Sequence, residues 1–415
     1  MVYIHDFLMK LVQTHIINNN HSLWKECDDI CFKSKNVYNS GLYLIKKQYE
    51  ENGKYLNYHE INKNFVINNN EAYRTLKAKV SQQTLMMLDK NFKSFFNALK
   101  EYAKFPNKFT AIPQSPKYKH KINGRYIAVF TQQTISKKDF KSGNLTLSGT
   151  NIKLTTKINF NNIQQIRIIP LRTKSYKIEI IYEKQEKQLI ENDYLCGIDV
   201  GLNNLFTISF NSVEKQNLII KGNALKSINQ YYNKKKARLQ SKLKNNQKIS
   251  KQILRLTEKR NNKIKDYIHK CTKILVDKLK QNNISKVAIG KNDQWKQDIN
   301  IGKKNNQNFV SVPHAMAINI LIYKLKMEGI DCKLHEESYT SKCSAYDLEK
   351  IGKHDVYLGK RIKRGLFETK SGKVINADSN GGYNIMRKVF PRELCSDGIE
   401  GLLVNPMVLT INQYN

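Results

Sequence analysis

The chain has 415 residues and carries 71 Lys and Arg against 35 Asp and Glu, a formal net charge of +36. Self-repulsion of this size opposes a compact state unless a polyanion binds, and nucleic acid is the polyanion that such proteins most often bind. Hydrophobic residues make up 40% and aromatic residues 10%, which excludes a mainly disordered chain. No apolar run reaches the roughly 18 residues of a membrane span, so no membrane partner is expected.

The first half of the sequence predicts one strand, then helices, and then several short strands. Residues 1–16 resemble a strand, and apolar residues at three- and four-residue steps predict helices over about 22–53 and 70–104. Strands are then predicted near 126–130, 145–147, 152–154, 165–169 and 176–182. Short strands at such regular spacing suggest a small barrel, in which the helices would be an insertion.

A charged and polar stretch near 186–192 predicts a domain boundary. After it we expect strands over 194–199, 205–210 and 218–220, two basic helices within 224–281 with a turn near 245–246, a strand at 287–290, a helix at 312–327, a strand at 332–336 and a helix at 378–389. This order resembles an RNase H-like domain, in which the first strand is central, the fourth lies beside it and the fifth lies beyond. The tail from 391 is predicted to be peripheral.

Two acids stand where such a sheet would bring them together. Asp199 ends the first strand of this domain, and Asp378 opens its last helix, whose N-terminus stabilises negative charge. Carboxylate oxygens are the ligands that Mg²⁺ prefers. Two such ions about 3.5–4 Å apart can hold the attacking and leaving oxygens of a phosphodiester.

Four segments around these acids carry a family signature. They are Gly197-Ile-Asp-Val-Gly-Leu-Asn203, Ile289-Gly-Lys-Asn-Asp-Gln-Trp-Lys-Gln297, Glu336-Glu-Ser-Tyr-Thr-Ser-Lys342 and Asn376-Ala-Asp-Ser-Asn-Gly-Gly-Tyr-Asn384. The first and last resemble RuvC motifs of TnpB proteins, which are RNA-guided nucleases of bacterial insertion sequences, related to miniature type V CRISPR effectors and to Fanzor. The other two match one TnpB branch, and the resemblance covers the whole chain.

The resemblance implies an α+β multidomain protein. A β-barrel wedge domain with a helical recognition insertion would precede an RNase H-like (RuvC) α/β nuclease domain. The implied ranges are 1–20 and 106–190 for the wedge, 21–105 for recognition, 191–390 for the nuclease and 391–415 for the tail. Basic helices over 223–282 and a degenerate zinc-ribbon-like hairpin over 343–376 would be inserted in the nuclease.

The third acid of the site is displaced relative to many members of the family. The Glu that ends their fourth strand is replaced by Gly290. The pair Glu336 and Glu337, at the end of the fifth strand, resembles the relocated Glu of some TnpB branches and of Fanzor. Successive strand residues point to opposite faces, so only one should face the metal. The resemblance favours Glu337, with Glu336 as the alternative and Asp293 as a further candidate.

The remaining expectations concern zinc and nucleic acid. Relatives often hold zinc with four cysteines before the last acid, but here Cys343 stands alone in that region, so no zinc is expected. Basic side chains that suggest phosphate contacts are Arg238, Arg255 and Arg260 in the long helices and Lys360 and Arg361 in the hairpin. A solvated basic surface is the alternative in both places.

As a function, the resemblance implies an RNA-guided DNA endonuclease of insertion-sequence origin. Asp199, Glu337 and Asp378 would bind two Mg²⁺ ions and direct a water at the phosphodiester. Its partners would be a transposon-derived guide RNA and a double-stranded DNA target. The N-terminal residues lack a signal-peptide pattern, so we expect a cytoplasmic, nucleoid-associated bacterial protein. Two alternatives stay open: a nuclease-dead RNA-guided repressor, and an RNase H-like transposase that acts without RNA.

Overall fold

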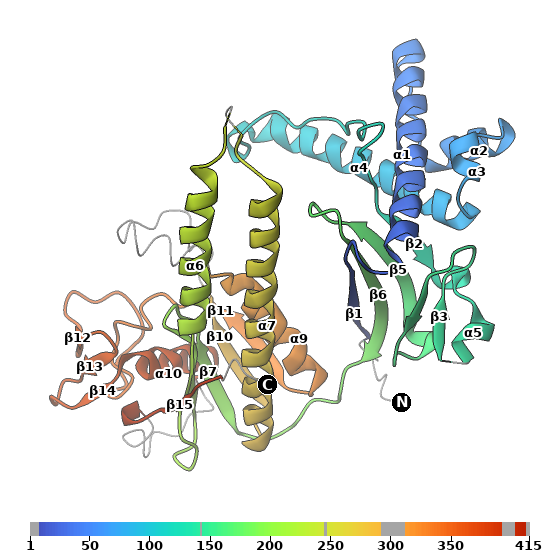
Figure 1. Cartoon of the computed structure of the whole chain (residues 1–415). Coiled ribbons are helices and arrows are strands. Elements are labelled where there is room, and N and C mark those ends of the chain that lie inside the picture. The colour runs from blue at the N-terminus through green and yellow to red at the C-terminus, as the bar shows by residue number, and fades with distance from the viewer. Residues whose placement is uncertain (1–7, 142, 245–246, 292–311, 392–402, 412–415) are drawn as a thin grey trace, which may run out of the picture. The chain divides into compact units, whose positions relative to one another are not determined.

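The computed structural model describes residues 8–141, 143–244, 247–291, 312–391 and 403–411. The chain divides into two compact units, Met1–Gln185 and Glu186–Asn415, which are treated separately below (Figure 1). The division falls at the start of the charged stretch that predicted a boundary. The finer domain ranges implied by the resemblance remain predictions.

Of the described helices of the first unit, the first four share one apolar core, whereas Phe140 of the short fifth helix packs against another. The helices are α1 (Trp24–Asn52), α2 (Tyr58–Ile67), α3 (Glu71–Arg74), α4 (Ala78–Lys104) and the short α5 (Lys137–Lys141). α1 ends at Gly53 in the left-handed conformation, as its sequence predicts. The predicted helix over 70–104 is divided between α3 and α4. Leu42, Ile61 and Leu88 are fully buried where α1, α2 and α4 meet, so this group is held by side-chain packing.

The strands of the first unit form two separate sheets. They are β1 (Leu8–Ile17), β2 (Ala128–Thr131), β3 (Asn144–Thr146), β4 (Lys153–Thr155), β5 (Ile163–Pro170) and β6 (Tyr176–Gln185). One antiparallel sheet has the order β1-β6-β5-β2, and β3 pairs with β4. Since β1 pairs with β6 along its whole length, the helices are an insertion between the first strand and the rest, as predicted. The predicted barrel is not confirmed, because the order described is open at β1 and β2.

The second unit is built on a six-stranded sheet. Its strands are β7 (Leu195–Asp199), β8 (Asn204–Phe210), β9 (Leu218–Lys221), β10 (Lys286–Gly290), β11 (Asp331–His335) and β15 (Met407–Leu409). The order is β11-β10-β7-β8-β9-β15, in which β7 is parallel to β10 and β10 to β11. The predicted positions of the first, fourth and fifth strands are therefore found. The tail was predicted to be peripheral, and its strand β15 pairs with β9 at the edge of the sheet.

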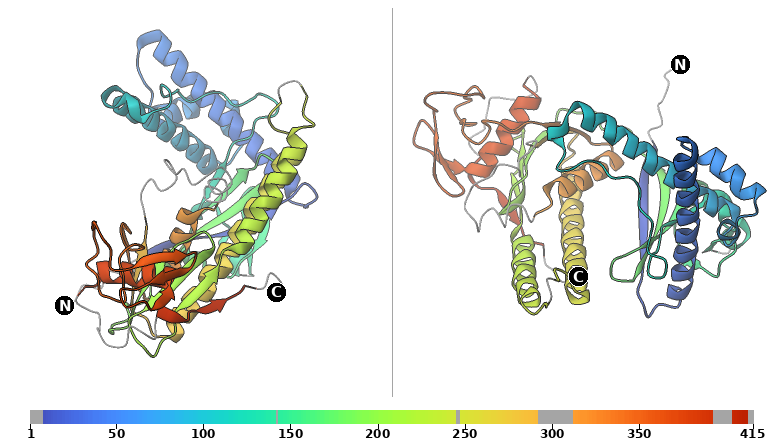
Figure 2. Two further views of the ribbon diagram at one scale, coloured as in Figure 1. Left: turned by 90° about the vertical axis from the view of Figure 1, so that its left-hand side faces the viewer. Right: turned by 90° about the horizontal axis from the view of Figure 1, so that it is seen from above.

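Helices cover both faces of this sheet. They are α6 (Asn223–Gln240), α7 (Lys251–Gln281), α9 (His314–Met327) and α10 (Ala377–Val389). Side chains alternate along β7, so that Ile198 packs into the core with α7 and α9, while Leu195 packs with α10. α6 and α7 lie side by side as a long pair, as two helices were predicted (Figures 1 and 2); residues 245–246 of the predicted turn lie outside the described residues. None of the described helices is long and apolar enough to cross a membrane.

A small sheet leads directly into α10. Strands β12 (Lys360–Lys363), β13 (Leu366–Glu368) and β14 (Val374–Asn376) are antiparallel, and Asn376 caps α10 by accepting from two backbone N–H groups of its first turn. α10 then lies very close to β7, since a Cβ atom on Gly197 would stand only 2.0 Å from the carbonyl oxygen of Gly382. Glycine at both positions brings the start of the helix over the end of β7.

Candidate active site

Asp199 lies at the end of β7, on the face that α10 covers. Its Oδ2 is only 3.3 Å from where a Cβ atom of Gly381 would stand, so the first turn of α10 passes directly over this carboxylate. Burial raises the pKa of Asp199 to about 8, and the negative charges of Glu337 and Asp378 add to this rise. The carboxyl therefore lies in a confined place with two other acids beside it.

Asp378 is held by side chains from two other elements. Asn204, at the start of β8, donates from Nδ2 to Asp378 Oδ2 at 2.6 Å. Arg361, on β12, lies with Nη2 3.3 Å from Asp378 Oδ1. Its charge also acts on Asp199 and opposes the rise of that pKa. The hairpin thus places a cation beside the two acids.

The side chain of Glu337 fills the space beside Gly290, the residue without a side chain that ends β10. A Cβ atom on Gly290 would lie 2.5 Å from Glu337 Oε2 and 2.6 Å from Cδ1 of Ile385. The carboxylate of Glu337 therefore stands where a side chain of residue 290 would begin. Burial raises the pKa of Glu337 to about 7, with Glu336 adding to the rise and Lys388 opposing it.

Glu336 points elsewhere. Its carboxylate accepts from Ser338 and lies 3.1 Å from Nζ of Lys388, and about half of the side chain is exposed (53%). The hydrogen bond from Ser338 and the charge of Lys388 lower its pKa. The structure thus brings together Asp199, Glu337 and Asp378 and not Glu336. Asp293, the further candidate, lies outside the described residues.

The donor set fits a hard divalent cation. The three carboxylates come from three segments, and burial together with neighbouring negative charge raises the pKa of Asp199 and of Glu337. A divalent ion would offset that charge, and oxygen-only ligands are those that Mg²⁺ takes. Asn204 was not singled out from the sequence, although it directly follows the first motif. Its contact with Asp378 becomes evident only once β8 is paired with β7.

The predicted basic residues divide into two groups. Arg238 and Arg255 are exposed and line a cavity of about 510 Å³ between α6 and α7, together with Tyr231, Lys235 and Lys259. Arg260 instead donates to Asn229 Oδ1 at 2.6–2.8 Å, and its guanidinium lies over the ring of Tyr232. Its side chain links the two helices.

Of the two hairpin residues, Lys360 is exposed and pairs with Glu368 at 3.1 Å. Arg361 instead pairs with Asp378, one of the three acids.

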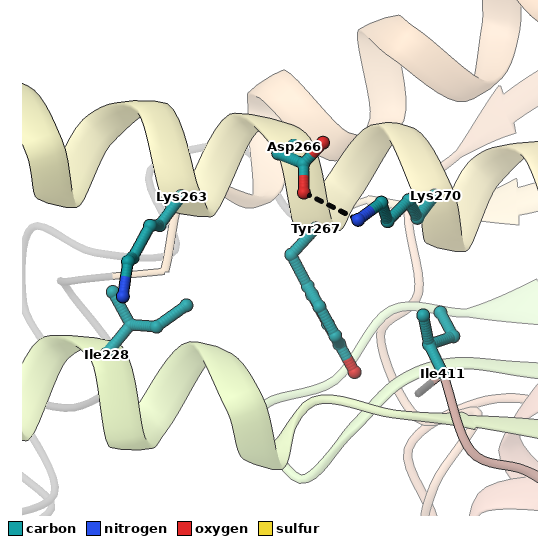
Figure 3. A pocket seen from close by; sticks show the side chains of 6 residues that line it. All are labelled: Ile228, Lys263, Asp266, Tyr267, Lys270 and Ile411. Carbon is teal, nitrogen blue, oxygen red and sulfur yellow. Dashed lines mark ion pairs between the residues drawn. The ribbon is translucent and has the colours of Figure 1, made fainter. Parts of the chain in front are cut away.

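A smaller cavity, of about 200 Å³, lies between α6, α7 and the segment after β15. Figure 3 shows Tyr267 reaching across it from α7, with Lys263 and Lys270 on the same helix. The Tyr267 hydroxyl donates to the carbonyl oxygen of Lys221 at 2.7 Å, and Lys270 pairs with Asp266 at 3.0 Å. The hydrogen bond of Tyr267 joins α7 to β9, whereas the pair of Lys270 and Asp266 lies within α7.

Two protein families match the chain. The probable transposase family OrfB of IS605 matches residues 178–296, and the Cas12f1-like TNB domain matches residues 314–385. A TnpB-like protein of Methanocaldococcus jannaschii is 25% identical over 157 residues, which are 36% of this chain and 55% of that protein. The match thus spans about half of the length of that relative.

Solved structures resemble the chain more weakly. The Cas12f1–sgRNA–target DNA complex aligns over 90% of this chain and 98% of its own, with a TM-score of 0.37 and 16% identity. The mini-RNA-guided endonuclease CRISPR-Cas phi3 aligns over 92% of each chain, with a TM-score of 0.44 and 9% identity. Both scores are too low to carry weight beside the family matches. The chain is thus similar in two of its segments to the OrfB family of IS605 and to the Cas12f1-like TNB domain, and in part to an archaeal TnpB-like protein.

Proposed function

We propose that the chain is a member of the TnpB family and an RNA-guided DNA endonuclease of insertion-sequence origin. The observation that carries the proposal is the convergence of Asp199, Glu337 and Asp378 at the end of β7. Glu337 occupies the space over Gly290, so the site keeps three acids although β10 ends without one. This favours an active nuclease over a nuclease-dead repressor.

The chain's own residues supply most of the arrangement for hydrolysis. Asp199, Glu337 and Asp378 would hold Mg²⁺, which when bound stabilises charge on a phosphodiester and acidifies water. Asn204 fixes the orientation of Asp378 through its 2.6 Å hydrogen bond. Arg361 is about half exposed (49%), so its guanidinium can pair with a phosphate oxygen as well as with Asp378.

The guide RNA and target DNA would lie on basic surfaces. Arg238 and Arg255 line one cavity with lysines and Tyr231, a combination that suits a phosphate backbone with a stacked base. The formal charge of +36 supports a large polyanionic partner. We assign this cavity to the guide RNA or its hybrid with DNA.

The test is cleavage of a target plasmid by the protein purified with its copurified RNA, in Mg²⁺. We expect cleavage by the wild type, none with Asp199→Ala, and unchanged RNA binding by that variant. Glu337→Gln should lose at least about a hundredfold in rate, because one of three ligands loses its charge, whereas Glu336→Gln is the matched control and should cut.

Three outcomes contradict the proposal in different ways. Target binding without cleavage by the wild type would identify a repressor. Cleavage that survives removal of the RNA would identify a transposase that needs none. Normal cleavage by Glu337→Gln together with loss of cleavage in Glu336→Gln would show that the third acid is Glu336 and not Glu337.

A further inference from the structure

A second cluster of side chains that could bind a metal lies in the segment between β11 and β12 and contains none of the three acids. Cys343, Glu349 and His354 each offer one ligand atom, and these atoms all lie within 4.8 Å of one another. Cys343 is fully buried and Glu349 is 6% exposed. A buried thiol, a buried carboxylate and an imidazole that converge on one place form a typical donor set for zinc.

The carboxylate of Glu349 is held by the backbone. Its Oε2 accepts from the N–H of Ser344 at 2.7 Å and its Oε1 from the N–H of Leu358 at 2.9 Å. These bonds fix its direction and leave lone pairs on both oxygens. Buried carboxylates are normally paired with a cation or bound to a metal. The charge of Arg387 interacts with both Glu349 and Cys343, so a metal ion at this place would share the compensation with that guanidinium.

The imidazole of His354 is held in the way that metal-bound histidines often are. One of its ring nitrogens donates to the carbonyl oxygen of Lys350 at 2.6 Å, and the other remains available as a ligand. The thiol of Cys343 lies 3.6 Å from the same carbonyl oxygen, so thiol and ring are neighbours.

We propose that Cys343, Glu349 and His354 bind one zinc ion. Cys343 binds as the thiolate, its proton passing to solvent, and a water completes four-coordination. No zinc was predicted from the sequence, because Cys343 is the one cysteine in the region 343–376, before Asp378. In the proposed site a carboxylate and an imidazole take the place of the missing thiolates.

Zinc would connect this loop to the helix that carries Asp378. The carbonyl oxygen of Cys343 accepts from Asn380 Nδ2 at 2.9 Å and from Asn384 Nδ2 at 2.8 Å, both on α10. An ion bound at Cys343 would therefore hold the segment from 343 to 358 against α10. This is a structural role that does not depend on cleavage.

The test is zinc binding by the full-length chain carrying Asp199→Ala, so that the acid cluster does not compete. After dialysis against a chelator, zinc is added, excess is removed and bound zinc is measured by mass spectrometry. We expect about one equivalent. Cys343→Ser and His354→Gln should each bind zinc at least about tenfold more weakly, whereas Cys332→Ser, which changes a cysteine on β11, should bind it normally.

Cobalt provides a second measurement. Co²⁺ bound at the site should show a sulfur-to-metal charge-transfer absorption that Cys343→Ser abolishes. His354 is only partly buried, so His354→Gln is expected to fold. Zinc binding by that variant therefore tests the proposal if Cys343→Ser does not fold. The proposal is overturned if the chelator-treated protein takes up no stoichiometric zinc, or if His354→Gln binds it as tightly as its parent.

Discussion

At the scale of single residues, Gly290 and Glu337 form a matched pair. Ala at position 290 would place a Cβ atom 2.5 Å from Glu337 Oε2 and 2.6 Å from Ile385 Cδ1. Because both neighbours are packed, the carboxylate must move away from Asp199. We expect Gly290→Ala to lower the cleavage rate at least about tenfold, since small misplacements of a catalytic group are costly, with RNA affinity unchanged.

Gly352 offers the control, because nothing lies within 4 Å of the Cβ atom that Gly352→Ala would add. That variant should cut at the wild-type rate. Equal rates for the wild type and both variants would show that Glu337 does not need the space over Gly290.

The pair also predicts a compensating exchange. Gly290→Glu alone should be inactive, because two side chains then compete for one place. Combined with Glu337→Gly, it returns the acid to the end of β10 and should recover part of the activity. Single-turnover cleavage of the two single variants and the double variant measures the coupling. A double variant no better than the worse single variant would argue that the loop position of the acid is essential.

Asp199 gives the metal-free protein a stability that depends on pH. Its pKa is raised to about 8 in the folded state, whereas it is about 3.9 in the unfolded chain. Between these two pH values the folded protein binds the proton more tightly than the unfolded chain does. Stability is therefore lost as pH rises from about 4 to about 8. Asp199→Asn removes this loss, and in chelator its melting temperature should exceed the wild type's by at least about 3 °C at pH 8.

At pH 4 the two proteins should melt nearly together. Asp193→Asn, which alters an exposed acid just before β7, should match the wild type at both values. If the difference between Asp199→Asn and wild type is the same at pH 4 and pH 8, the raised pKa is not its cause.

At the scale of helices and strands, periodicity predicted most elements but not those whose limits depend on local capping or distant pairing. α2 was missed, although Asn57 and Glu60 form a capping box at its start. β15 was missed because three residues show no usable period, and only pairing with β9 makes them a strand. The relative places of β7, β10 and β11 were predicted because the order of strands and helices resembles that of an RNase H-like domain.

The site could be predicted to a similar extent. Asp199 and Asp378 stand at element ends, so the pattern alone drew attention to them. The choice of Glu337 came from a family resemblance, since spacing leaves both glutamates possible. The contacts of Asn204 and Arg361 with Asp378 depend on β8 and β12 being folded beside α10. The set of Cys343, Glu349 and His354 is similarly visible only when a loop has closed.

One element is fixed by a polar contact that can be tested. Asp28 on α1 accepts from Arg125 at 2.7–2.8 Å and from the hydroxyl of Tyr176 on β6, which joins helix to sheet. Burial alone would raise the pKa of Asp28, but these hydrogen bonds outweigh it and lower the pKa. Its stabilisation is therefore present above the unfolded pKa and is lost as pH falls.

Asp28→Asn should lower the free energy of unfolding by about 1–3 kcal/mol at neutral pH, because the contact is only partly buried. Asp29→Asn is the control, since Asp29 is exposed and pairs with Lys33 one turn away. It should cost about 0.3–0.5 kcal/mol. Urea unfolding measures both, and equal effects would show that the link between α1 and β6 is not stabilising.

At the scale of the whole molecule, the charge of +36 is distributed over both units, yet three acids gather at one point. General repulsion opposes folding without a polyanion, whereas the local surplus of negative charge lets a divalent cation bind within a positive field. The two features require different partners. Under the proposed function, RNA would compensate the first and a metal ion the second, so RNA binding should respond strongly to salt.

The salt dependence separates specific phosphate contacts from net charge. Arg238→Ala with Arg255→Ala removes two exposed cations from the cavity between α6 and α7. If each contacts one phosphate, the slope of log affinity against log salt should become shallower by about 1.4–1.8. Lys187→Ala with Lys280→Ala removes the same charge from two lysines that pair with Glu328.

That control should change the slope by less than half as much, because its cations are already engaged by Glu328. Fluorescence anisotropy of the labelled guide RNA between about 50 and 200 mM salt measures both slopes. Equal changes in the two double variants would mean that total charge alone attracts the RNA. The cavity between α6 and α7 would then be a solvated basic surface, the alternative that its sequence left open.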